Sequence, residues 1–404
     1  MPYQNSRTVY KTSRSPYARG GNNSGGNRRK APSKHGQYID PARFVKVAKP
    51  PTVEEAYVPE NMFADFKVDP RLHANIAAKG YVTPTPIQDK TIALGLAGKD
   101  VIGIANTGTG KTAAFAVPIL HRLMTDKSAY ALVVAPTREL AQQIEEECRS
   151  LGKGGGFTGA ILIGGSAMGP QLRDLRGNPR IVIGTPGRIK DHIERRTLDI
   201  SKFNIVVLDE VDRMLDMGFV DDVRLLLSKL SSDRQSFYFS ATMDARVNGL
   251  ISTFSPDATT ISLKVSDTSD NVHQDVVNYS GRTDQAEKLH DILIHPDTAK
   301  VIVFDETQRG VERLEGDLLA RGFKVEAIHG GKSQGQRQRA LRMFKTNEVK
   351  ILIATDVAAR GIDVSDITHV INYSQPHTYD DYVHRVGRAG RAGRIGYALT
   401  FVER

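Results

Sequence analysis

The stretch Ala105-Asn106-Thr107-Gly108-Thr109-Gly110-Lys111-Thr112 decides the fold of this 404-residue chain. It follows a short apolar run, Val101–Ile104, and precedes Ala113–Ala116, which is a favourable opening for a helix. A glycine-bearing turn between strand and helix that ends in Lys-Thr is the sequence context of a phosphate-binding loop. Gly108 and Gly110 allow the backbone to curl so that its N–H groups point at phosphate oxygens.

The last two residues of this loop add the chemistry of a nucleotide site. Lys111 can reach the terminal phosphates, and the hydroxyl of Thr112 can hold Mg²⁺. The N-terminus of the following helix favours bound anions. A tight turn that binds nothing is the alternative, but the Lys-Thr pair in this context disfavours it. We therefore expect a site for a nucleoside triphosphate.

Composition indicates about two folded domains preceded by a basic tail. Hydrophobic residues make up 40% and charged residues 25% of the chain, which is ordinary for a globular protein. Residues 1–50 hold eleven Lys or Arg and one acid, so they account for the whole net charge of +9 and leave the remainder near neutral. Because this segment is rich in Gly, Asn and Ser, we expect residues 1–50 to be disordered. Its arginines and tyrosines suggest weak RNA binding, with a purely solubilising tail as the alternative.

A single cysteine, Cys148, excludes an internal disulfide framework and a thiolate zinc cluster. No stretch approaches about eighteen consecutive apolar residues, so the sequence predicts no membrane span. The N-terminus lacks the apolar core of a signal peptide, and we expect a cytoplasmic protein.

Short apolar runs alternate with helical stretches from about residue 60 to 265. Their lack of strict alternation is typical of strands covered by helices on both faces, and predicts an α/β fold with a doubly wound parallel sheet. The expected strands are Val101–Ile104, Tyr130–Ala135, Gly159–Ile163, Ile181–Ile183, Ile205–Leu208, Phe237–Phe239 and Thr260–Lys264.

A polar linker, Lys264–Asn271, precedes a second α/β domain that we expect to span 272–404. It contains no second phosphate loop. Its expected strands are Val301–Phe304, Val325–Ile328, Ile351–Ala354 and Val370–Tyr373, with helices at Gln308–Leu319 and Gln334–Phe344.

Asp209-Glu210-Val211-Asp212 follows the apolar strand Ile205–Leu208. Ligands of open α/β sheets lie beyond the carboxyl ends of the strands, so Asp209 can meet a Mg²⁺ ion on the phosphates, partly through water. Glu210 can orient or deprotonate an attacking water.

Pro84-Thr85-Pro86-Ile87-Gln88 lies upstream of the phosphate loop. The amide of Gln88 offers a donor and an acceptor that match adenine N6 and N7. Tyr81 and Phe63 are candidate stacking partners for the base.

Together these residues resemble the DEAD-box family of ATP-dependent RNA helicases over nearly all of residues 63–404. The resemblance includes a Q motif at Phe63 and Gly80–Gln88, a phosphate loop at Ala105–Thr112, and Asp-Glu-Val-Asp in place of Asp-Glu-Ala-Asp. It continues through Pro136–Leu140, Gly164-Gly165, Thr185–Arg188, Ser240–Thr242, Gln334 and Arg337, Ala354–Asp363 and Tyr382–Arg391.

The resemblance implies two tandem RecA-like domains and assigns roles residue by residue. Catalysis falls to Lys111, Asp209, Glu210, Arg388 and Arg391, and Asp363 meets the ribose. Residues Phe63, Tyr81, Gln88 and Ala105 to Thr112 bind ATP, with Mg²⁺ at Thr112 and Asp209. Coupling between the domains falls to Ser240, Thr242 and His384. RNA binding falls to Pro136, Thr137, Arg138, Gly165, Thr185, Arg188, Gln334, Arg337, Thr355 and Arg360.

Two departures from the family pattern carry expectations of their own. Val211 stands where the family has Ala, and we expect its side chain to be buried behind the acids. Asp305 and Glu306 follow the strand Val301–Phe304 where small or neutral residues are commoner, which puts RNA contact by that segment in doubt.

The resemblance implies RNA-stimulated ATP hydrolysis by a monomer that binds RNA without sequence specificity. Phosphate and sugar contacts position a strand without reading its bases, and the 2′-hydroxyls distinguish RNA from DNA. A DNA-directed relative is an alternative, opposed by Gln88 and by Ser240–Thr242. A clamp that binds ATP and RNA without hydrolysis is another, opposed by the presence of Glu210, Arg388 and Arg391.

Overall fold

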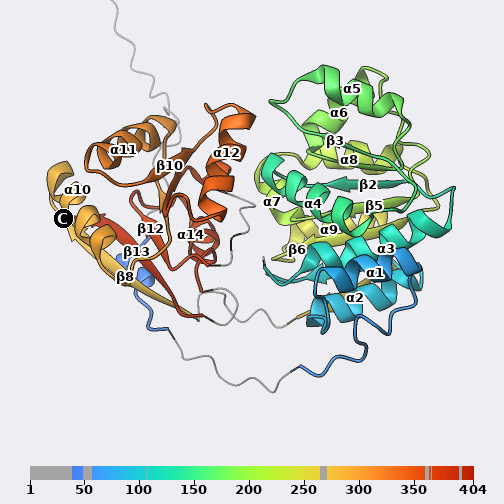
Figure 1. Cartoon of the computed structure of the whole chain (residues 1–404), viewed down its shortest axis with the longest axis horizontal. Coiled ribbons are helices and arrows are strands. Elements are labelled where there is room, and N and C mark those ends of the chain that lie inside the picture. Colours follow the sequence, from blue (N-terminus) through green and yellow to red (C-terminus); the bar gives the residue numbers. More distant parts are fainter. Residues whose placement is uncertain are drawn as a thin grey trace, which may run out of the picture. The chain divides into compact units, whose positions relative to one another are not determined.

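The computed structural model of the chain describes residues 39–48, 57–106, 108–263, 271–359, 364, 366–390 and 394–404 (Figure 1). These residues form two parallel sheets, each covered by helices. Among them, no helix is long and apolar enough to cross a membrane.

The first sheet has seven strands in the order β3-β4-β2-β5-β6-β1-β7, and every pairing is parallel. All seven strands predicted for this half are present. Their bounds are β1 Val101–Ile104, β2 Ala131–Val134, β3 Gly159–Leu162, β4 Ile181–Gly184, β5 Ile205–Leu208, β6 Gln235–Ser240 and β7 Thr259–Ser262. The strands β2, β4, β5 and β6 are buried along their whole length, as strands with helices on both faces must be.

Two apolar cores lie on opposite faces of this sheet, because successive residues of a strand point to opposite sides. Val133 of β2 belongs to one core and its neighbours Leu132 and Val134 belong to the other. Helices α1 to α4 pack into the first core and α6 to α9 into the second. The helices are α1 Pro70–Ala78, α2 Pro86–Leu96, α3 Lys111–Thr125, α4 Arg138–Leu151, α5 Met168–Arg176, α6 Pro186–Glu194, α7 Val211–Asp216, α8 Val220–Lys229 and α9 Ala245–Phe254.

The second sheet has six strands in the order β10-β11-β9-β12-β13-β8, again all parallel. Its strands are β8 Val272–Tyr279, β9 Val301–Phe304, β10 Val325–Ile328, β11 Ile351–Ala354, β12 His369–Asn372 and β13 Gly396–Glu403. Its helices are α10 Gly281–Ile294, α11 Gln308–Ala320, α12 Gln334–Lys345, α13 Asp356–Ala359 and α14 Tyr379–Val386. The four strands predicted between 301 and 373 are present, whereas β8 was not predicted.

The two sheets share one strand order. When strands are counted along the chain within each sheet, the first six of the first sheet and the six of the second both run third, fourth, second, fifth, sixth, first. Strand β7 extends the first sheet beyond β1. The corresponding edge of the second sheet, β8, pairs instead with Lys46.

Residues 39–48 correct the prediction that disorder extends to residue 50. Asp40 caps the 3₁₀ helix η1 (Pro41–Phe44) by accepting a hydrogen bond from the backbone N–H of Ala42 at 2.9 Å. Ile39 and Phe44 are buried in a core of the second domain. Burial of these two apolar side chains favours an ordered conformation of this short stretch.

Candidate functional site

The loop between β1 and α3 is curled around its own lysine. Gly108 and Gly110 have φ of +85° and +88°, in the left-handed region that glycine adopts without strain. Lys111 is 6% exposed, and its Nζ donates to the carbonyl of Ala105 at 3.0 Å. The ammonium group thus lies against the backbone of the loop.

Helix α2 begins with residues that hold this loop from outside. The hydroxyl of Thr85 donates to the carbonyl of Thr109 at 2.8 Å, and the hydroxyl of Thr109 donates to the carbonyl of Asn106 at 2.8 Å. Nε2 of Gln88 donates to the carbonyl of Gly110 at 3.2 Å, while its Oε1 accepts from the backbone N–H of Thr85 at 2.9 Å. Both ends of the Gln88 amide are engaged within the protein, and each end keeps one further hydrogen-bonding position, since the NH₂ group has two donors and the oxygen has two lone pairs.

The two candidate stacking residues are placed differently. Phe63 is 2% exposed and stacks on Tyr81, with ring centroids 5.3 Å apart and an interplanar angle of 29°. The hydroxyl of Tyr81 donates to Oε1 of Glu147 at 2.9 Å. Tyr81 lines a pocket together with Gln88 and Thr112, whereas Phe63 supports Tyr81 from the core.

The acids after β5 are buried at the carboxyl end of the sheet. Asp209 is 2% exposed, and burial raises its pKa to about 6, although the positive charge of Lys111 lowers it. Glu210 has φ +54° and ψ +56°, an unusual conformation for a residue with a side chain. Such strain persists where the surroundings hold it, and it frequently marks functional positions. Val211 is fully buried, as predicted.

Asp212 ties these acids to the end of β6, a role that the sequence did not reveal. Its Oδ2 accepts from the backbone N–H groups of Ala241 and Thr242 at 3.0 Å each, and from the Thr242 hydroxyl at 3.2 Å. Its backbone N–H donates to the hydroxyl of Ser240 at 3.3 Å. The carbonyl of Ser240 also accepts from the N–H of Ala105 at 3.1 Å. The acids after β5, the phosphate loop and Ser240–Thr242 are therefore one bonded unit.

The residues assigned to RNA in the first half follow β2, β3 and β4. Pro136 and Thr137 follow β2, and Thr137 caps α4. Gly165 follows β3 with φ +74°, and a side chain there would clash with the Arg138 guanidinium. Arg138 thus packs over Gly165 at the carboxyl edge of the sheet.

Two further residues of this set lie at the start of α6. Thr185 follows β4 and directly precedes α6. Nη1 of Arg188 donates to the carbonyl of Ser166 at 3.3 Å, which places this guanidinium beside the loop after β3. The structure therefore brings the RNA candidates of the first half to the ends of three neighbouring strands.

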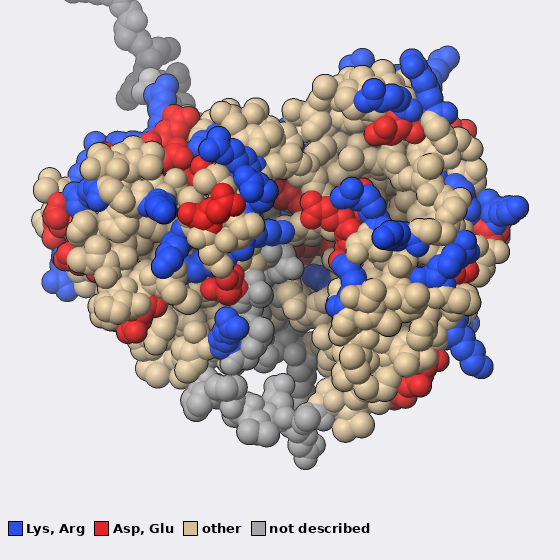
Figure 2. Space-filling view, in the orientation of Figure 1, with Lys and Arg blue, Asp and Glu red and all other residues tan. Residues whose placement is uncertain are grey.

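In the second domain, α12 carries Gln334 and Arg337 in its first turn, where a spacing of three residues puts both on one face. The helix holds four basic residues and no acid. Figure 2 shows Lys and Arg side chains gathered over α12. Thr355 follows β11, at the same edge of the sheet.

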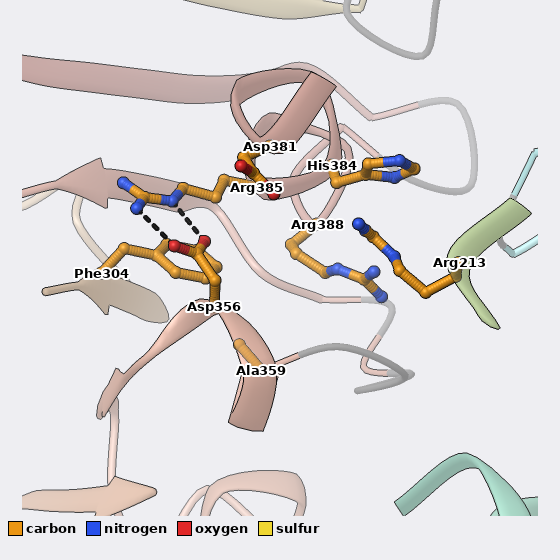
Figure 3. Close-up of a pocket in the computed structure, with 8 residues that line it drawn as sticks. All are labelled: Arg213, Phe304, Asp356, Ala359, Asp381, His384, Arg385 and Arg388. Carbon is orange, nitrogen blue, oxygen red and sulfur yellow. Dashed lines mark hydrogen bonds and ion pairs between the residues drawn. The ribbon is translucent and has the colours of Figure 1, made fainter. Parts of the chain in front are cut away.

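Helix α14 carries Arg385, which has a structural role, close to the candidate site residues His384 and Arg388 (Figure 3). Arg385 is 2% exposed and forms a two-pronged ion pair with Asp356, at 2.6 and 2.7 Å. Its guanidinium also lies 5.1 Å from the ring centroid of Phe304. His384 and Arg388 project to the other side of the helix from Arg385. Sequence reasoning did not assign Arg385 this role.

Asp305 is one of the two acids that follow β9. It is 7% exposed, and its Oδ1 accepts from the backbone N–H of Thr307 at 3.1 Å, at the start of α11. A side chain at Gly310 would clash with the same carboxylate. Asp305 therefore stabilises the N-terminus of α11, where a negative charge is favourable.

Four candidate residues lie outside the described part of the chain. They are Thr107, Arg360, Asp363 and Arg391.

The arrangement of the remaining candidates defines a class of protein. A phosphate loop, an acid pair and a serine–threonine segment meet at the ends of β1, β5 and β6, which are neighbours in the first sheet. Arginines and backbone groups suited to an anionic strand follow β2, β3 and β4, on the other half of the same edge. This is a nucleotide-binding α/β protein of two RecA-like domains, equipped to hold a nucleic acid.

Comparison with known proteins identifies the family. The family model described as "DEAD/DEAH box helicase" matches residues 85–250, and that described as "Helicase conserved C-terminal domain" matches 284–393. The chain is 44% identical over 344 residues to the DEAD-box ATP-dependent RNA helicase CshA of Bacillus subtilis, covering 84% of this chain and 69% of that protein. It is 43% identical over 347 residues to the ATP-dependent RNA helicase DeaD of Mycobacterium tuberculosis, covering 84% and 61%.

A solved structure shows the same fold. That of S. cerevisiae Dbp5 bound to RNA and ADP BeF3 superimposes with a TM-score of 0.74 at 30% identity, covering 85% of this chain and 89% of that one. The chain belongs to the DEAD-box helicase family.

Proposed function

We propose that the protein is an ATP-dependent RNA helicase whose ATP hydrolysis is stimulated by RNA and opens short duplexes or remodels RNA–protein complexes. The observation that carries this proposal is the division of one sheet edge: phosphate-binding elements follow β1, β5 and β6, and RNA candidates follow β2, β3 and β4. Relatives named as RNA helicases and a related structure bound to RNA and ADP BeF3 support it. We further propose domain bounds of 60–265 and 272–404, and a cytoplasmic monomer.

The nucleotide site falls to the first domain. The Lys111 ammonium and the loop N–H groups would bind the phosphates, and Gln88 with Tyr81 would select adenine. Asp209, partly through water, and the Thr112 hydroxyl would hold Mg²⁺, which supplies neutralisation of phosphate charge. The donors fit this ion, since carboxylate and hydroxyl oxygens are hard ligands and Asp209 is a buried carboxylate beside the loop. Within the described residues, no three His, Cys, Asp or Glu gather as a protein-only metal site.

Hydrolysis requires a positioned water and stabilisation of developing charge. Glu210, in the Asp-Glu-Val-Asp form of the acid motif, orients or deprotonates the attacking water. Arg388 and Arg391 supply positive charge to the transferring phosphoryl group. Asp363 contacts the ribose. Assembly of the site only when ATP and RNA are both bound links hydrolysis to domain closure.

Coupling between nucleotide state and closure falls to Ser240, Thr242 and His384. The bonds from Asp212 to Ala241 and Thr242 support this role, because they join the acid motif to the end of β6. A change at Asp209 or Glu210 on hydrolysis would therefore reach Ser240–Thr242 through Asp212.

Two sets of residues that follow strands would bind RNA, and this binding does not depend on the RNA sequence. The first set is Pro136, Thr137, Arg138, Gly165, Thr185 and Arg188, and the second is Gln334, Arg337, Thr355 and Arg360. Such residues contact phosphates and sugars, which fix the position of a strand without reading bases. Contacts to 2′-hydroxyls would favour RNA over DNA.

Strand displacement tests this proposal. A short RNA duplex with a labelled strand is incubated with the full chain and ATP, with ADP, or with a non-hydrolysable ATP analogue. Release of the labelled strand with ATP and not with ADP is expected. ATP-independent release, or release of a DNA duplex at the same rate, would refute it.

A further inference from the structure

Residues 39–48, which we call the N-terminal anchor, pack on the second domain although they precede the first domain in sequence. Phe44 is fully buried and Ile39 is 7% exposed, and both join the core that contains Val272 of β8 and Tyr382 of α14. By contrast, the neighbouring Val45 is 56% exposed. Neither family model reaches this segment, since their matches begin at residues 85 and 284.

The anchor pairs with the edge strand of the second sheet at one position. The N–H of Lys46 donates to the carbonyl of Gln274 at 3.0 Å, and the N–H of Gln274 donates back to the carbonyl of Lys46 at 2.8 Å. This antiparallel pair lies on β8, the strand whose counterpart β1 is covered by β7 in the first sheet. An unpaired edge strand is open to unwanted pairing, and the anchor occupies one position of this edge.

The anchor also contacts α14 directly. The ring of Phe44 lies 4.7 Å from that of Tyr382, centroid to centroid. The guanidinium of Arg43 lies 3.8 Å from the ring centroid of Tyr379, a favourable cation–π distance. The hydroxyl of Tyr382 donates to Oε1 of Gln274 at 2.8 Å, which closes a ring of contacts between anchor, β8 and helix.

Helix α14 depends on such contacts. It has only eight residues, and a helix of that length is unstable without tertiary packing. Arg385 holds it through the ion pair with Asp356, and Tyr379 and Tyr382 contact the anchor. Arg388 follows the end of this helix by two residues, so its position is set by how firmly the helix is held.

We propose that the N-terminal anchor positions α14, and through it Arg388, for hydrolysis; this rests on the proposed function. Phe44 and Arg43 are then positioning residues, because they contact the helix and not the nucleotide. A displacement of about 1 Å at a catalytic group is enough to cost about 100-fold in rate. The residues assigned to the ATP phosphates and base belong to the first domain, whereas the anchor contacts the second domain.

The test compares Phe44→Ala with Phe44→Leu and Val45→Ala in the full chain. ATP turnover at saturating RNA is normalised to the number of ATP-binding sites, and ATP affinity is measured separately. We expect Phe44→Ala to lower kcat at least about 10-fold, since a buried ring is lost and the helix shifts, with ATP affinity within about twofold. Phe44→Leu should retain most of the rate, and Val45→Ala should equal the unmodified protein.

Equal kcat in Phe44→Ala and Val45→Ala would overturn the inference, as would parallel losses of kcat and ATP affinity. If Phe44→Ala does not fold, Arg43→Ala and Arg43→Lys decide, because Arg43 is exposed and its removal leaves no cavity. A reduced kcat in Arg43→Ala that Arg43→Lys restores supports the anchor, and an unchanged kcat overturns it. Absence of RNA-stimulated hydrolysis in the unmodified chain would instead refute the proposed function, and this inference with it.

Discussion

The two sheets have the same strand order, but they differ in the connection that leaves the first strand of each. In the first domain, six residues including the glycine loop separate β1 from α3. In the second, Ser280 alone separates β8 from α10. A one-residue connection cannot curl around a phosphate, so the second sheet has the architecture of a nucleotide domain without its phosphate loop.

The connections after the second, third and fourth strands are alike in the two domains. Thr137 caps α4 after β2, and Thr307 caps α11 after β9. Glycines follow the third strand in both sheets, as Gly165 and Gly331, and a threonine follows the fourth. The threonines and glycines at the strand ends that we assign to RNA are therefore repeated in the two domains, whereas the phosphate loop after β1 has no counterpart after β8.

The largest expected effect tests whether ATP hydrolysis needs Arg388 of the second domain. Arg388→Ala should lower RNA-stimulated ATP hydrolysis about 1000-fold, the usual scale for an arginine that stabilises a transferring phosphoryl group. ATP affinity should change little, because the residues assigned to the phosphates and the base are in the first domain. Arg282→Ala, an exposed arginine on α10, is the matched control. A normal rate in Arg388→Ala would show that the first domain is catalytically complete.

The next largest effect tests the catalytic role of Glu210 in the first domain. Glu210→Gln keeps the size of the side chain and removes its basicity, so hydrolysis should fall about 300-fold while ATP still binds. Asp216→Asn, at the exposed end of α7, is the control. Turnover and binding of a fluorescent ATP analogue are measured in parallel. Unchanged turnover would remove Glu210 from the reaction.

A smaller effect, on stability, tests the structural role of Arg385 in α14. Arg385→Ala leaves Asp356 without its partner, and breaking such a buried pair costs about 3 kcal/mol of unfolding free energy. Urea denaturation of the second domain measures it, with Arg282→Ala expected within about 0.5 kcal/mol of the unmodified protein. Equal stability of the two variants would show that the ion pair does not hold the helix.

Much of the fold and of the nucleotide site was predictable from the sequence. The strand runs around Val133 and Val207 are unbroken apolar stretches, and the loop at Ala105–Thr112 carries its own glycine and lysine signals. Strand β8 was not predicted, because His273, Gln274 and Asp275 interrupt its apolar pattern at the edge of the sheet. A sequence pattern therefore predicts those strands and helices whose buried residues follow a regular local spacing.

Contacts between distant residues could not be predicted in that way. The anchor depends on the ring contact between Phe44 and Tyr382, which are 338 positions apart in the chain. Asp212 and Arg385 stand inside recognisable motifs, yet their partners are chosen by the fold. The double engagement of the Gln88 amide is likewise a tertiary property, since both Thr85 and Gly110 must be placed before it forms.

The smallest expected effect is on base selection by the side-chain amide of Gln88. Gln88→Ala should reduce the preference for ATP over GTP about tenfold, because a paired donor and acceptor contribute about 1–3 kcal/mol of base discrimination. Thr85→Ala loosens the same loop without touching the base, so it should weaken ATP and GTP equally. Competition binding with both nucleotides measures this. An unchanged preference in Gln88→Ala would assign base selection elsewhere.

We propose that ATP hydrolysis in the first domain requires the second domain, which RNA brings into place. Steady-state ATP hydrolysis by the full chain tests this most directly, without nucleic acid, with single-stranded RNA, and with single-stranded DNA of the same sequence and length. We expect strong stimulation by RNA and little by DNA. Equal hydrolysis in all three conditions would contradict it.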